Sequence, residues 1–166
     1  MAIKFNANEV LAMAEQIERN AAAFYRKAAS SHPAKHNQDF LLKLAAMEED
    51  HERTFAGIRA QLPAREKEET AYDPMNEAAQ YLDTLANAHG GEGSPAVTGQ
   101  LTGKETLEQV LRMAIELEKK SILFYVGLKD LVPPKLGQSR VDDVIREEKT
   151  HVVILSRELS ALSKNR

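Results

Sequence analysis

Hydrophobic residues recur at spacings of three and four along four long stretches of the chain, roughly 8–30, 34–62, 103–131 and 139–163. This spacing is typical of a helix that buries one face against a core. Most glycines and prolines fall between these stretches, where they interrupt helices. The pattern therefore predicts four long helices. A fifth, short helix is expected at roughly 74–88, within the connection between the second and third.

Residues that favour helix ends support three of these boundaries. Asn6 with Glu9, and Thr102 with Glu105, have the spacing of a capping box, in which two side chains satisfy backbone donors reciprocally. Ser139 is a candidate N-cap for the last helix. These signals predict that the third helix begins near residue 103 and the fourth near residue 139.

The second half of the chain repeats the first at an offset of 100 residues, which predicts two similar helical hairpins. The two hairpins cover 8–62 and 103–163, and a long crossover at 63–102 joins them. Short links make the paired helices antiparallel, whereas the crossover can return along the bundle and leave the second and third helices parallel. We expect one all-α domain over 1–166, a four-helix bundle with one long crossover. The recurring residues are Val10, Leu11, Met13, Ala14, Glu18, Phe24, Tyr25, Pro33, Glu48, His51 and Leu62, each found again 100 positions later.

Composition narrows the possible functions. The chain has 166 residues and a net charge of −3, which gives no indication of a nucleic-acid or membrane partner. The first residues lack the continuous apolar run of a secretory signal, so a cytoplasmic location is expected. The chain contains no cysteine. Disulfides, thiolate metal sites and a cysteine nucleophile are therefore excluded.

Six polar residues interrupt the apolar stripes near their middles, and their spacing predicts a metal site. In each half, a glutamate lies 30 residues before a Glu-x-x-His pair, so a hairpin brings all three to one height. Buried carboxylates without a partner are very costly, and two divalent cations would neutralise four of them. One glutamate from each of two helices and Glu-x-x-His from the other two is the di-iron carboxylate pattern. The predicted ligands are Glu18, Glu48, His51, Glu118, Glu148 and His151.

Iron fits this oxygen and imidazole ligand set, although manganese or zinc can also bind it. A single Glu-x-x-His pair is most often surface charge, but two copies on core stripes favour the metal site. Tyr25 and Tyr125 each follow a predicted ligand by seven residues. They are expected either to contact the ligands or to pack in the core. Glu15 and Glu116 are poor candidates for further ligands, because they lie off the expected faces.

The segments IERNAAAFYRKAA and MEEDH, with LEKKSILFYVGL and REEKTH, are similar to the rubrerythrin branch of the ferritin-like superfamily. The resemblance covers the four helices and implies a ferritin-like four-helix bundle. It implies peroxide reduction at a di-iron centre. Rubrerythrins also carry a cysteine-rich, rubredoxin-like domain, which this chain lacks. They have a further ligand glutamate one turn after the third helix's glutamate, where this chain has Ser121.

The function expected from these observations is that of a di-iron oxidoreductase that reduces hydrogen peroxide. Without its own electron-relay domain, the protein would need an external electron donor protein. The resemblance and base rates favour a homodimer. Three alternatives stay open: a ferroxidase that oxidises and handles iron, an oxygenase that uses dioxygen on an organic substrate, and a metal-binding module without turnover.

Overall fold

Four long helices lie side by side in a computed structural model of the protein, which describes residues 5–68 and 95–164. They are α1 (Ala7–Ser31), α2 (Lys35–Ala60), α5 (Leu107–Lys129) and α6 (Gln138–Lys164). Within the described ranges there is no strand. The predicted all-α four-helix bundle is therefore confirmed, with each of the four predicted helices within four residues of its expected bounds.

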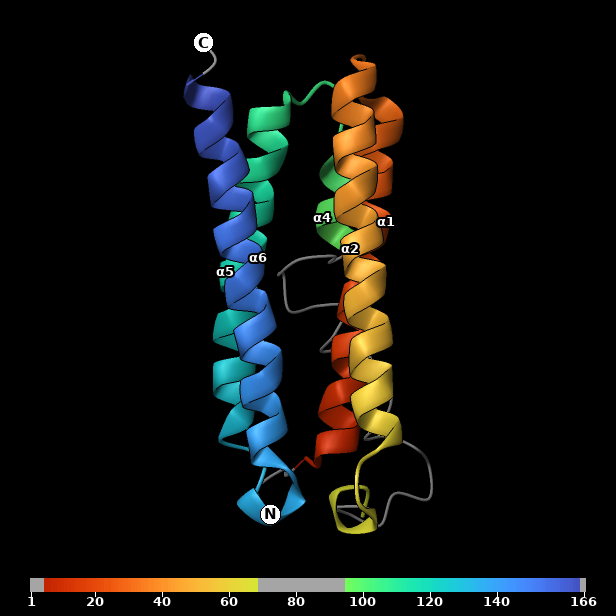
Figure 1. The fold of residues 1–166 in the computed structure, drawn as a ribbon, viewed down its shortest axis with the longest axis vertical. Helices are drawn as coiled ribbons and strands as arrows, with labels where there is room; N and C mark the ends of the chain where they lie inside the picture. Colours follow the sequence, from red (N-terminus) through yellow and green to blue (C-terminus); the bar gives the residue numbers. More distant parts are fainter. Residues whose placement is uncertain (1–4, 69–94, 165–166) are drawn as a thin grey trace.

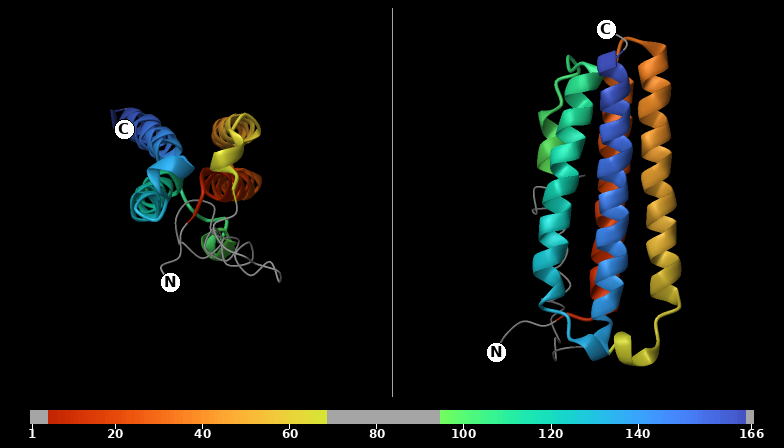
Figure 2. Two further views of the ribbon diagram at one scale, coloured as in Figure 1. Left: turned by 90° about the horizontal axis from the view of Figure 1, so that it is seen from below. Right: turned by 60° about the vertical axis from the view of Figure 1, so that its left-hand side comes forward.

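The helices form two antiparallel hairpins, α1 with α2 and α5 with α6, as the internal repeat predicts (Figure 1). Helices α2 and α5 run in the same direction, and α1 also contacts α6. A short helix, α4 (Pro95–Gln100), lies outside the bundle against α1 (Figure 2). The short helix predicted at roughly 74–88 lies outside the described residues. The division of the chain into one domain stays a prediction.

Two short 3₁₀ helices close the same end of the bundle. They are η1 (Ala64–Glu66), which follows α2, and η2 (Pro134–Leu136), which precedes α6, and they pack against each other. Gly137 follows η2 with a φ of 93°, a left-handed conformation that favours glycine. A Cβ added at Gly137 would come within 2.5 Å of the Ala7 Cβ. This glycine therefore lets α6 begin directly against the start of α1.

One of the two predicted capping boxes is confirmed. At the start of α1, the Asn6 backbone N–H donates to Glu9 Oε2 at 2.8 Å, and the Glu9 N–H donates to Asn6 Oδ1 at 2.9 Å. Helix α6 begins at Gln138, so the prediction that Ser139 is its N-cap is wrong. The left-handed Gly137 places the helix start one residue earlier than the polar side chain indicated.

The capping box predicted from Thr102 and Glu105 is wrong as a helix start. Glu105 accepts hydrogen bonds from the Thr102 N–H and hydroxyl and from the Gly103 N–H, and so closes a turn instead. Gly103 has a φ of 79°, which interrupts the helical path. Helix α5 starts four residues later, where Thr106 and Gln109 form the capping box.

Two hydrophobic clusters fill the core, one at each end. The lower cluster, at the η1 and η2 end in Figure 1, includes Phe5, Leu11, Ile17, Phe55, Leu128, Val141 and Val144. The upper cluster includes Phe24, Leu41, Leu44, Leu111, Leu117 and Leu155. Burial of each large apolar side chain contributes roughly 1.5–3 kcal/mol. The two clusters therefore hold the bundle together above and below a buried polar layer. None of the described helices is both long and apolar enough for a membrane span.

Candidate metal centre

The first hairpin supplies three of the predicted ligands to the middle of the bundle. Glu18 of α1 and Glu48 of α2 are buried, and His51 lies one turn after Glu48 on the same face of α2. The His51 ring Nδ1 lies 3.1 Å from Glu48 Oε2, a hydrogen bond within a single helix. The Glu-x-x-His spacing thus places Glu48 and His51 on one face of α2, as the sequence predicted.

The second hairpin supplies the other three ligands. Glu118 of α5, Glu148 of α6 and His151 of α6 are all buried. The His151 ring Nδ1 lies 3.0 Å from Glu118 Oε1, so this hydrogen bond joins the two helices. The equivalent histidines therefore have different partners, although the two motifs have the same spacing.

The two hairpins meet at the histidines. His51 Nε2 and His151 Nε2 are 3.4 Å apart, and the rings stack with centroids 4.2 Å apart at an angle of 27°. Glu48 Oε2, which contacts His51, also lies 3.7 Å from His151 Nδ1. One carboxylate therefore faces both histidines. The offset of 100 residues in the sequence becomes direct contact between equivalent side chains in the structure.

Two groups of side chains in the described part of the chain bring ligand atoms within 4.8 Å of one another. The first is Glu48, His51 and His151, and the second is Glu118, Glu148 and His151. The structure thus gathers five of the six predicted ligands. Glu18 belongs to neither group, but its charge acts on the Tyr125 hydroxyl together with the charges of Glu118 and Glu148. Glu18 therefore faces the same polar layer.

The chemistry of this layer fits metal cations. Glu48 is fully buried, and its Oε1 has no hydrogen-bond partner among the described residues. Removing a carboxylate from water without a compensating partner is costly, and a bound cation removes that cost. Neutral imidazole and carboxylate are also the donors that divalent iron, manganese and zinc accept. The donor set and the burial therefore fit two metal ions.

His51 differs from the other predicted ligands in its exposure to solvent. Its side chain is 17% exposed, whereas that of His151 is 1% exposed. Burial lowers the pKa of His51, but the hydrogen bond with Glu48 and the charges of Glu48, Glu147 and Glu148 raise it above its ordinary value. The ring is therefore held in a strongly negative environment. This is the environment that a cation would favour.

Tyr25 and Tyr125 are fully buried on opposite sides of the polar layer. Tyr25 belongs to the upper cluster, with Phe24 edge-on at 5.3 Å, and Tyr125 belongs to the lower cluster, with Phe124 at 5.4 Å. Burial raises the pKa of Tyr125 well above 10, and the charges of Glu148, Glu18 and Glu118 raise it further. Tyr125 therefore lies close enough to the carboxylates to respond to them. A part for either tyrosine in chemistry stays a prediction.

Two features of the site were not evident from the sequence. Glu147 acts on His51 across the space between α6 and α2. Glu15 forms a double ion pair with Arg59, at 2.6 and 2.9 Å. That pair explains why this buried acid, one turn from Glu18, is not among the gathered ligands. Both features depend on how closely two helices approach each other, which the spacing of residues along the chain does not show.

Comparison with known proteins supports the fold. No family model matches the chain, and no curated protein matches its sequence. Among solved structures, a "putative ferritin-like diiron-carboxylate protein" from Thermotoga maritima superposes with a TM-score of 0.56 at 22% sequence identity. The match covers 96% of this chain and 98% of that one. The protein therefore has the ferritin-like fold of four helices, and what the bundle binds must be argued from its own residues.

Proposed function

We propose that the protein is a di-iron oxidoreductase of rubrerythrin type, which reduces hydrogen peroxide with electrons from an external donor protein. The observation that carries the proposal is the layer in which three buried carboxylates and two imidazoles from α2, α5 and α6 come together, with Glu18 of α1 also buried. A layer of this kind lowers the stability of the bundle unless it serves a ligand, because charged groups are removed from water. A redox metal pair explains both its charge and its position.

The residues that would hold the two iron ions are Glu18, Glu48, His51, Glu118, Glu148 and His151. When bound, two ferrous ions supply the two electrons that, with two protons, convert one hydrogen peroxide to two waters. The chain's own part is to provide imidazole and carboxylate ligands, and to keep bulk water away on all sides but that of His51. The hydrophobic clusters above and below the layer complete this enclosure.

Tyr125 is the residue best placed to hold a proton beside the layer. Its hydroxyl is fully buried and has no hydrogen-bond partner among the described residues. Because its pKa is raised, the hydroxyl keeps its proton at neutral pH. It could therefore donate a hydrogen bond to an acceptor within the layer. The chain contains no cysteine, so we expect its electrons to come from a separate donor protein. The donor protein and the homodimer stay predictions.

The test is anaerobic reconstitution with Fe²⁺, followed by measurement of bound iron and of its oxidation by peroxide and by dioxygen. Two irons per chain, oxidised at least tenfold faster by peroxide, would support the peroxidase. Two irons oxidised faster by dioxygen would instead favour a ferroxidase or an oxygenase, and slow oxidation by either would favour a metal-binding module.

The matched control is the double variant Glu48→Ala/Glu148→Ala, which removes one carboxylate from each Glu-x-x-His motif. It should bind almost no iron. Far-ultraviolet circular dichroism would check that the variant keeps its helices. Wild-type protein that binds no more iron than this variant would contradict the proposed function.

A further inference from the structure

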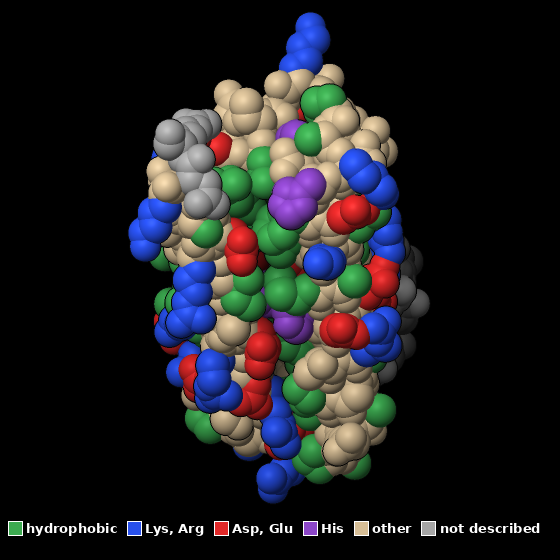
Figure 3. Space-filling view, turned by 45° about the horizontal axis from the view of Figure 1, so that its top comes forward, with side chains coloured by type: hydrophobic (Ala, Val, Ile, Leu, Met, Phe, Trp, Pro, Cys, Tyr) green, Lys and Arg blue, Asp and Glu red, His purple; other side chains and the backbone are tan. Residues whose placement is uncertain are grey.

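Helices α2 and α6 face the same side of the bundle (Figure 2), and the seam between them is called the groove below. Helix α1 packs along α2, and α5 packs along α6, but α2 and α6, both fully described, make no extended backbone contact. The space-filling view shows histidine and acidic side chains among the hydrophobic ones on this face (Figure 3). The bundle is therefore less tightly closed here than within either hairpin.

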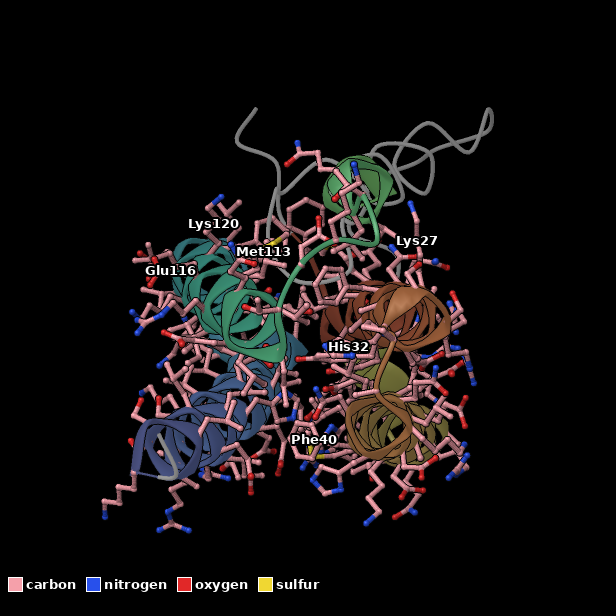
Figure 4. All side chains as sticks on the ribbon, turned by 90° about the horizontal axis from the view of Figure 1, so that it is seen from above. Lys27, His32, Phe40, Met113, Glu116 and Lys120 are labelled. Carbon is pink, nitrogen blue, oxygen red and sulfur yellow. The ribbon has the colours of Figure 1, made fainter. Side chains whose placement is uncertain are left out.

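Half-buried side chains line this groove. Phe40 of α2 lies in the space between the two helices (Figure 4). Met47 and His51 follow it on the same flank of α2 at helical spacing. Glu147 and Ile154 lie seven residues apart on one flank of α6, and the charge of Glu147 acts on His51. All five are neither fully buried nor fully exposed. The groove thus includes His51, whose side chain is 17% exposed at the edge of the candidate metal centre.

His51 is the predicted ligand that this groove makes accessible. The other five are almost completely buried within the described structure. A cation that enters from solvent must give up water molecules and exchange them for protein ligands. His51 is where that exchange can begin without opening the helices.

Glu147 lies beside this point with a free carboxylate. It forms no ion pair or hydrogen bond with any described residue, although it is half-buried. Nearby surface acids are paired: Glu52 with Arg19 at 2.7 Å, and Asp143 with Arg146 at 3.0 Å. Glu147 is four residues before His151, so both side chains lie on the same flank of α6. Its charge reaches His51 across the groove.

We propose that divalent cations reach the candidate metal centre through the groove between α2 and α6, and that Glu147 binds the incoming cation transiently before His51 does. This inference rests on the proposed function, because it concerns the loading of the same site. Glu147 is thus a residue that controls the rate of metal uptake. It is not one of the ligands that hold the metal at equilibrium.

The experiment mixes Co²⁺ alone with the metal-free protein and follows the cobalt absorption bands by stopped flow. Replacing Glu147 by Gln should slow uptake roughly three- to tenfold at low salt, because one attractive charge near the path is lost. Glu147→Lys should slow it further. High salt should reduce both differences, since it screens the charges. A purely structural role would not produce this salt dependence.

The control is Glu116→Gln, which changes net charge equally. Glu116 is exposed on α5, on the far side from the groove (Figure 4). The Glu116→Gln variant should take up Co²⁺ at the wild-type rate. At equilibrium, Glu116→Gln and both Glu147 variants should bind as much Co²⁺ as wild type. Equal uptake rates in all proteins would overturn the proposed route and leave the metal site standing. Less Co²⁺ bound at equilibrium by Glu147→Gln would make Glu147 a ligand and also overturn it. A wild type that binds no Co²⁺ would overturn the metal site itself.

Discussion

The two hairpins carry the same Glu-x-x-His motif, yet their histidines have different environments. His51 contacts a glutamate of its own helix and is 17% exposed, whereas His151 contacts α5 and is 1% exposed. The motif places both rings in the same layer. The packing of neighbouring helices then makes the first hairpin the open side of the site and the second hairpin the closed side.

The largest effect is expected when Glu48, the carboxylate that faces both histidines, becomes Gln. Metal affinity should fall by more than the roughly 10–100-fold typical of an outer-shell partner. The metal-free protein should become more stable by about 1–3 kcal/mol, because a fully buried carboxylate is removed. Isothermal titration calorimetry and urea unfolding measure the two changes. The control is Glu49→Gln, one residue along α2, and a Glu48→Gln protein that still binds two ions would contradict the prediction.

The open and closed sides can be compared directly by replacing each histidine with Ala. Both variants should lose metal affinity by a factor of about 100 or more, since each removes a ligand. Added imidazole should restore much of the affinity of His51→Ala, because that position is reached from solvent. Imidazole should not restore the metal affinity of His151→Ala, because that position is enclosed. His151→Ala should also be less stable by about 1–3 kcal/mol, because Glu118 loses its hydrogen bond.

Cobalt binding with and without imidazole measures this difference. Equal restoration of both variants would show that the two sides of the site are equally accessible. That result would remove the contrast between the hairpins. It would also weaken the case for a single groove.

The hairpins differ again where a partly exposed ion pair in the first corresponds to an apolar pair in the second. Glu15 and Arg59 of the first hairpin correspond, at the offset of 100, to Ile115 and Leu159 of the second. Arg59→Leu alone should destabilise the protein by about 1–3 kcal/mol, because it leaves Glu15 buried without its cation. Glu15→Ile with Arg59→Leu should be within about 1 kcal/mol of wild type, or more stable. Urea unfolding of the metal-free proteins tests this, and a double variant as unstable as the single one would contradict it.

The sequence was sufficient for the elements, and for the meeting of polar side chains, that depend on local spacing. Apolar periodicity predicted the four long helices, and the repeated 30-residue interval predicted which polar residues meet in the core. The start of α5 was missed because Thr102 and Glu105 have the spacing of a capping box and in fact close a turn around Gly103. Spacing alone does not distinguish these two uses of the same hydrogen bonds.

The openness of the site could not be predicted, because it depends on how far apart α2 and α6 lie. The same holds for the pairing of Glu15 with Arg59, which are 44 residues apart in the chain. Both follow from packing between whole helices. A helical pattern shows which flank a residue occupies, but not whether another helix covers that flank.

The smallest expected effect concerns the turn that Glu105 closes before α5. At the start of α1, the equivalent hydrogen bonds form the capping box of the helix itself. The backbone N–H and hydroxyl of Thr102, together with other backbone N–H groups, lower the pKa of Glu105 from 4.5 to about 2. A lowered pKa in the folded state means that ionised Glu105 stabilises the fold above about pH 4.5. This stabilisation is lost as the pH falls from 4.5 toward 2. Because the group is exposed, the change should be small.

Thermal unfolding of the metal-free protein at pH 7, 4 and 2 checks this prediction against Glu105→Gln. The wild type should have a slightly higher Tm at pH 7. The difference should be much smaller at pH 2, where Glu105 is protonated in the unfolded state and about half protonated in the folded state. Glu158→Gln, an exposed change on α6, is the control for net charge. A Tm difference that stays the same at all three pH values would mean that the turn depends on the shape of the side chain and not on its charge. In that case the charged hydrogen bonds of this turn would not be what distinguishes the start of α5 from that of α1.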